Sequence, residues 1–136
     1  MWRLILASLL VPMNLSAEEP GVCARKVAMD RKFILKQGEC AVVARTTEIR
    51  FLKISNESRC PSDVQCGSAG NVTALFAIKQ KGAAPANIKI DSNGNSGSAI
   101  YRKNEIKLLD VAPYPISTRG IPQNEYTVAL LVSTTK

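Results

Sequence analysis

The chain has 136 residues, with 18 Lys and Arg against 11 Asp and Glu, no histidine, and a formal net charge of +7. The absence of histidine removes the commonest general base and the commonest zinc ligand, so neither catalysis through a histidine nor a zinc site is expected. The basic residues are scattered along the chain without clustered runs or interleaved aromatic residues. This pattern predicts solvated faces with a weak attraction for polyanions, and it argues against a nucleic-acid binder.

The N-terminus has the pattern of a cleaved secretory signal. Arg3 precedes an apolar run from Leu4 to Val11, and small residues lead to Ala17 before two glutamates. Cleavage after Ala17 is predicted, which makes residues 1–17 a signal peptide. The apolar run is far shorter than the roughly 20 residues of a membrane span, so no membrane anchor is expected. Residues 18–136 are then expected to form one domain, secreted or periplasmic, with a net charge of about +6 and no cofactor.

Four cysteines remain after the predicted cleavage, and an oxidising compartment favours disulfides between them. Three pairings are open in principle. Cys60 with Cys66 is favoured, because the five residues between them fold back with little loss of loop entropy. Cys23 with Cys40 is then the second expected bridge.

Apolar and polar residues alternate with a period of two through most of the chain after residue 30. In the segment from Val72 to Lys79, the residues Val72, Ala74, Phe76 and Ile78 share one face. The alternation returns in 88–91 and 126–133, and turn residues separate the segments. About seven such strands predict an all-β fold, an antiparallel immunoglobulin-like β-sandwich.

The alternation changes face in two segments. In 49–54 and in 106–111 the apolar residues switch register, which predicts a bulge or a doubly covered strand. The polar segment 91–98 is predicted to be a hairpin loop. Its oxygen-bearing residues Asp91, Asn93 and Asn95 have the spacing that opens a calcium loop, but Arg102 stands where a glutamate ligand is required. No metal site is therefore expected.

The segment 58–71 is the most distinctive of the chain. Cys60 and Cys66 bracket a polar turn between two apolar runs, so a stapled, exposed loop is predicted, with Arg59, Pro61, Asp63 and Gln65 as its binding residues. The alternative is that Arg59 pairs with a nearby carboxylate and the loop closes one end of the sandwich. Glycosylation sequons at Asn56 and Asn71 flank the loop, and they matter only in a source that glycosylates them.

The run Ser58-Arg59-Cys60-Pro61, followed by Cys66 and then Ala69-Gly70-Asn71, resembles a family of small secreted bacterial proteins without an established activity. The resemblance extends to the segments from Tyr101 to Val111 and from Tyr126 to Val132. In that family an aspartate is usual where Glu57 stands, and Val-Trp where Gly67-Ser68 stand. The resemblance implies a small exported protein.

These observations lead to three hypotheses about function. The first is a non-enzymatic binding or accessory domain, monomeric, whose partner is another envelope or extracellular protein. The second is a secreted protease inhibitor that offers Arg59 and Cys60 to a trypsin-type pocket. The third, an enzyme with a Ser-Lys pair, requires the two side chains to meet in a cleft.

Overall fold

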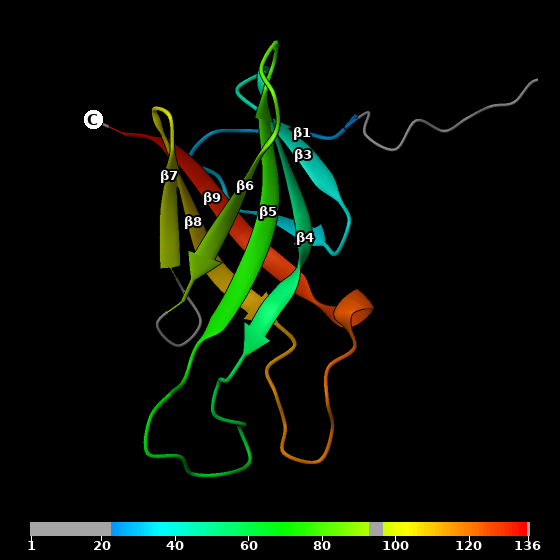
Figure 1. Cartoon of the computed structure of the whole chain (residues 1–136), viewed down its shortest axis with the longest axis vertical. Helices are drawn as coiled ribbons and strands as arrows, with labels where there is room; N and C mark the ends of the chain where they lie inside the picture. The colour runs from blue at the N-terminus through cyan, green and yellow to red at the C-terminus, as the bar shows by residue number, and fades with distance from the viewer. Residues whose placement is uncertain (1–22, 93–96, 136) are drawn as a thin grey trace, which may run out of the picture.

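The computed structural model describes residues 23–92 and 97–135, which form a two-layer β-sandwich (Figure 1). The prediction of an all-β sandwich is confirmed. The predicted signal peptide lies outside the described residues. One sheet has the order β1-β3-β4-β5-β6 and the other the order β2-β9-β8-β7. The first sheet contains β1 (Lys26–Val27), β3 (Cys40–Val43), β4 (Thr47–Glu57), β5 (Val72–Gln80) and β6 (Ala86–Asp91), and the second contains β2 (Phe33–Lys36), β7 (Gly97–Tyr101), β8 (Asn104–Ala112) and β9 (Thr127–Thr134).

The alternating residues pack between the two sheets. In β5, Phe76 is fully buried and its ring centroid lies 5.7 Å from that of Phe51 in β4. Leu130 of β9 and Leu108 of β8 face the same interior from the other sheet. Burial of alternate apolar side chains from both layers is the main stabilising contribution in such a sandwich.

The predicted changes of face are β-bulges. The β4–β5 register shifts between Phe51 and Lys53, and the β8–β9 register shifts between Leu108 and Asp110. In each case the extra residue lets Ile54 and Val111, which follow the bulge, return to the core.

Nine strands are present in the described part of the chain, where about seven were predicted. The two-residue β1 pairs in parallel with β3, a contact between chain segments that periodicity cannot reveal. The prediction of a hairpin at 91–98 is wrong. β6 pairs with β5 and β7 pairs with β8, so the chain passes from one sheet to the other between Asp91 and Gly97. Among the described residues, no helix is long and apolar enough to cross a membrane.

The sandwich has two different ends. At one end lie two long connections, 58–71 between β4 and β5 and 113–126 between β8 and β9, the second of which contains the 3₁₀ turn Gln123–Glu125. These two connections, called the loop end, run side by side at the bottom of Figure 1. At the opposite end lie four shorter connections, 28–32, 44–46, 81–85 and 102–103, called the turn end.

Candidate functional site

The distinctive motif extends the β4–β5 ladder into the loop end. The Ser58 amide donates to the Asn71 carbonyl at 2.8 Å, and the Cys60 amide donates to the Ala69 carbonyl at 2.9 Å. The Ser58 hydroxyl also donates to Asn71 Oδ1 at 2.6 Å. The two halves of the motif, which are separated in sequence, therefore face each other as a pair of extended segments.

Gly70 is required by this pairing. Its backbone has φ +67°, and a Cβ added there would lie 1.8 Å from the Ser58 carbonyl oxygen. Only a residue without a side chain combines this left-handed backbone with such a close approach. The glycine of the motif is thus explained by the path of the backbone.

Both expected disulfides are present, Cys23–Cys40 and Cys60–Cys66, and the described residues contain no free cysteine. The first ties the segment before β1 to the start of β3, and the second staples the loop end. Two such bridges indicate an oxidising, extracytoplasmic environment.

Arg59 lies in the interior between the two sheets. Its side chain has an exposed fraction of 0%, and its Nη2 lies 2.6 Å from Glu57 Oε2 while Nε donates to Glu57 Oε1 at 2.8 Å. Nη1 donates to the Val111 carbonyl at 2.7 Å and Nη2 donates to the Pro113 carbonyl at 3.0 Å. The guanidinium also lies 4.9 Å from the ring centroid of Tyr114. Arg59 thus joins the end of β4 to the end of β8 in the other sheet.

The expectation that the loop offers Arg59 to a partner is corrected by this geometry. A bidentate pairing with Glu57 and two carbonyl acceptors hold the guanidinium inside, where its planar donors are satisfied. Arg59 instead pairs with a nearby carboxylate, that of Glu57, as the alternative interpretation of the sequence predicted. A trypsin-type pocket would have to receive an exposed side chain, so Arg59 is not placed to act as the specificity residue of an inhibitor.

Glu57 also binds Tyr126. The Tyr126 hydroxyl donates to Glu57 Oε2 at 3.0 Å, and the ring is buried at the start of β9. Burial, together with the negative charge of Glu57 and this hydrogen bond, raises the pKa of Tyr126 to about 12. Glu57 therefore connects Arg59 and Tyr126 in one network.

Asp63 joins the two loops to each other. Its Oδ1 accepts a hydrogen bond from the Ser117 amide at 2.8 Å, and its Oδ2 accepts a short one from the Ser117 hydroxyl. Beside it, the Ser62 amide donates to the Pro115 carbonyl at 3.0 Å. The bonds from Ser117 lower the pKa of Asp63 below its ordinary value of 3.8. Asp63, another of the predicted binding residues, thus braces connection 58–71 against connection 113–126.

The remaining predicted binding residues differ in exposure. Pro61 is half-buried and Gln65 is exposed. Beyond these, Val64, Tyr114 and Ile116 are 43%, 44% and 45% exposed at the same end. A hollow of about 100 Å³ opens beside the last two, lined also by Arg119 and Glu125, which form a 2.6 Å ion pair. The exposed surface of the loop end therefore presents three large apolar side chains among polar ones.

Sequence reasoning missed the residues that reach the loop end from far along the chain. Gln123 accepts a hydrogen bond from the Ile54 amide at 3.1 Å and donates to the Ile54 carbonyl at 2.9 Å. It satisfies a backbone pair beside the second irregularity of β4, between Ile54 and Asn56. Ser117 and Tyr126 were missed likewise. The one signal that pointed toward this network was the alternative that Arg59 pairs with a nearby carboxylate.

The other predicted sites are less informative. No group of three or more His, Cys, Asp or Glu side chains arranged to hold a metal occurs in the described residues. Asp91 accepts a hydrogen bond from the Thr73 hydroxyl at 2.7 Å, while Asn93 and Asn95 lie outside those residues. No protein-family model, curated protein or solved structure matches this chain.

Proposed function

We propose that this protein is a non-enzymatic binding or accessory domain, exported by residues 1–17, whose loop end contacts another envelope or extracellular protein. The observation that carries the proposal is the combination of rigid bracing with apolar exposure. Val64, Tyr114 and Ile116 stay exposed on two connections that are joined to each other and to the core.

Bracing matters because binding must order whatever segment it uses. The Cys60–Cys66 bridge, the Arg59–Glu57 pair and the Asp63–Ser117 bonds hold the loop end in one shape before any partner arrives. A preordered surface loses less conformational entropy on association, so a small patch can support useful affinity. Exposed tyrosine and aliphatic side chains gathered in one place are typical of the centre of a protein interface.

The residues of the binding surface are therefore reassigned. Arg59 supports the surface from within and the exposed Asp63 braces its two connections, whereas Val64, Gln65, Tyr114 and Ile116 form the part offered to a partner. This arrangement is compatible with membership of the small secreted bacterial family whose motif the chain resembles, because the motif residues Cys60, Gly70 and Asn71 build the support.

The proposal is tested by crosslinking capture from native envelope extract with the chain from Glu18 onward. Tyr114→Ser with Ile116→Ser removes the apolar side chains from the loop end. Ile34→Ser with Leu109→Ser removes two exposed apolar side chains, 47% and 38% exposed, from the second sheet and serves as the matched control.

A partner captured by the wild type and the control variant, but lost with the loop-end variant, supports the proposal. Equal capture by all three proteins contradicts it. The export step is tested separately, by locating the full chain in cell fractions and by the mass of the processed protein. Retention of residues 1–17 would contradict the predicted cleavage.

A further inference from the structure

The turn end gathers positive charge. Its four connections carry six exposed basic residues and one acidic residue, Asp30. The basic residues of the four connections are Arg31, Lys32, Arg45, Lys81, Arg102 and Lys103. Within the described part of the chain, no salt bridge is formed by any of these six. The scattered basic residues of the sequence are thus brought together by the fold.

Hydrogen bonds between two of the connections, and from the end of β9 to the other two, show that all four lie at one end. The Lys81 amide donates to the Thr46 carbonyl at 2.7 Å, which places connection 81–85 beside connection 44–46. The Thr135 amide donates to the Lys103 carbonyl at 2.8 Å, and the Asp30 amide donates to the Val132 carbonyl at 2.8 Å. The end of β9 therefore lies between the other two connections.

Two of the arginines occupy backbone conformations that favour glycine. Arg45 has φ 66° and Arg102 has φ 54°, both in the left-handed region. A side chain in that region is unfavourable by roughly 1–2 kcal/mol, and glycine or asparagine is the common choice in such turns. Asp30 (φ 59°) and Ala44 (φ 53°) share this conformation in connections of the same end, so it belongs to the tight turns and assigns no role to the arginine side chains by itself.

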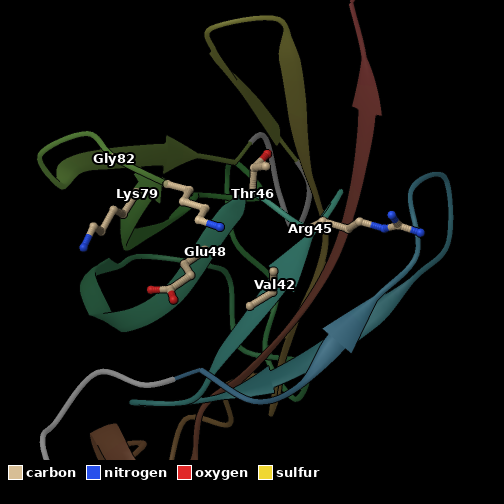
Figure 2. A pocket seen from close by; sticks show the side chains of 7 residues that line it. Val42, Arg45, Thr46, Glu48, Lys79 and Gly82 are labelled. Atoms are coloured by element: carbon tan, nitrogen blue, oxygen red, sulfur yellow. The ribbon is translucent and has the colours of Figure 1, made fainter.

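Two hollows lie beside the connections. One, of about 340 Å³, is lined by Arg45, Lys79 and Lys81 together with Glu48. In Figure 2 the Arg45 side chain extends away from Glu48, while Lys79 and Glu48 lie on the other side of the view. The other hollow, of about 290 Å³, is lined by Tyr101, Arg102, Lys103 and Gln80. The buried Oε1 of Gln80 has no hydrogen-bond partner within the described part of the protein. Cations therefore border both hollows.

An apolar side chain accompanies the charge. Ile100 is 68% exposed, the largest exposed fraction among the large apolar side chains described, and it lies two residues before Arg102. The ring of Tyr101 lies 5.6 Å from the Arg102 guanidinium. A basic surface with an adjacent exposed aliphatic residue and an aromatic ring has the composition of a peripheral membrane-binding surface.

We propose that the turn end binds the anionic headgroups of a lipid surface. Cations on four separate connections spread the charge over a blunt end, which suits a sheet of headgroups better than one small anion. The phosphate of each headgroup fits the cation-lined hollows, and Ile100 adds apolar contact at the acyl boundary. This site is independent of the proposed loop-end partner, because it lies at the opposite end of the sandwich.

The test is co-sedimentation of the chain from Glu18 onward with vesicles of equal parts phosphatidylcholine and phosphatidylglycerol. This chain omits the apolar run of the signal and retains every described strand and both disulfides. Near an anionic surface each basic residue contributes about 1 kcal/mol, so Lys81→Gln, Arg102→Gln and Lys103→Gln together weaken binding about 100-fold. Vesicles of phosphatidylcholine alone are expected to bind little protein.

The matched control neutralises three exposed lysines away from the turn end, with Lys36→Gln, Lys53→Gln and Lys89→Gln. It has the same net charge as the turn-end variant and is expected to bind within about twofold of the wild type. If both variants lose vesicle binding equally, the net charge of the protein explains the binding and the proposal is overturned. It is also overturned if anionic vesicles do not bind the wild type, if inorganic phosphate displaces the vesicles at matched ionic strength, or if duplex DNA binds more tightly through the same residues.

Discussion

At the loop end both arginines are ion-paired, Arg59 with Glu57 and Arg119 with Glu125, whereas at the turn end six basic residues have no ion-pair partner among the described residues. The loop end is held by a disulfide and by hydrogen bonds between its two connections. The turn end consists of shorter connections between strands, and its charges face solvent. The loop end is thus a braced surface whose arginines are ion-paired, and the turn end is a surface of exposed positive charge.

The two ends therefore differ in the kind of contact that can stabilise a complex. A surface whose charges are already satisfied can gain little from a charged partner, so the loop end is suited to apolar contact. An unpaired cationic surface attracts anions over about a Debye length, and this attraction weakens with salt. Salt is therefore expected to affect the turn end strongly and the loop end weakly.

The largest expected effect is the loss of Arg59. Arg59→Ala removes the cation that pairs with the buried side of Glu57 and the donor to the carbonyls of Val111 and Pro113, and it lowers the free energy of unfolding by about 3–5 kcal/mol. The exposed pair provides the control, since Arg119→Ala costs no more than about 1 kcal/mol. Urea unfolding measures both. Similar losses in the two variants would show that Arg59 does not clamp the sheets.

Substitution of Gly70 has the next largest effect. Gly70→Ala brings a Cβ against the Ser58 carbonyl at positive φ and lowers the free energy of unfolding by about 2–3 kcal/mol. Gly67→Ala in the same connection meets no atom within 4 Å and is expected to change stability by no more than about 0.5 kcal/mol. Thermal unfolding distinguishes them. If the two variants melt together, the close backbone approach at Gly70 is not maintained.

Tyr126→Phe removes one hydrogen bond from Glu57 and is expected to lower the free energy of unfolding by about 1–2 kcal/mol. The pKa of Tyr126 is raised from 10.0 to about 12, so its contribution is complete below pH 10 and disappears as the pH rises through about 12. Absorbance titration of the phenolate tests this. A phenolate step near pH 12 that persists in Tyr126→Phe would contradict the assignment.

At the turn end a glycine substitution acts in the opposite direction. Arg45→Gly releases a side chain from the left-handed region and leaves stability unchanged or raises it by up to about 1 kcal/mol. The same variant binds anionic vesicles more weakly, which separates stability from binding. A loss of more than about 1 kcal/mol would show that Arg45 stabilises its own turn.

The smallest expected effect concerns Asp63. Because its pKa in the folded protein is lowered, its contribution is present above the ordinary value of 3.8 and is lost as the pH falls through the lowered pKa. Ser117→Ala removes the hydroxyl donor and raises the pKa of Asp63 toward the ordinary value. Carbon NMR of the carboxyl group follows the change. An unchanged pKa in Ser117→Ala would contradict the bracing between the two connections.

Some features of the molecule were predictable because their causes are local. Alternation in 72–79 identified β5 and its buried face, since successive side chains of a strand point to opposite sides. The register changes identified two bulges for the same reason. The Cys60–Cys66 bridge was predictable because only five residues separate the two cysteines. The 91–98 segment was misassigned, because polar residues mark a turn without saying which sheet the next strand joins.

What the sequence by itself determined about this protein is therefore the all-β class and the buried faces of its longer strands, and it favoured the two disulfide pairings that the structure contains. The tertiary structure alone decided that Arg59 is buried, because its acceptors at Val111 and Pro113 lie 52 and 54 residues away along the chain. It also decided that scattered basic residues meet at one end, since only the order of strands in the two sheets brings their connections together. Side-chain periodicity is a local property, whereas burial of a charge and clustering of charges depend on which distant segments become neighbours.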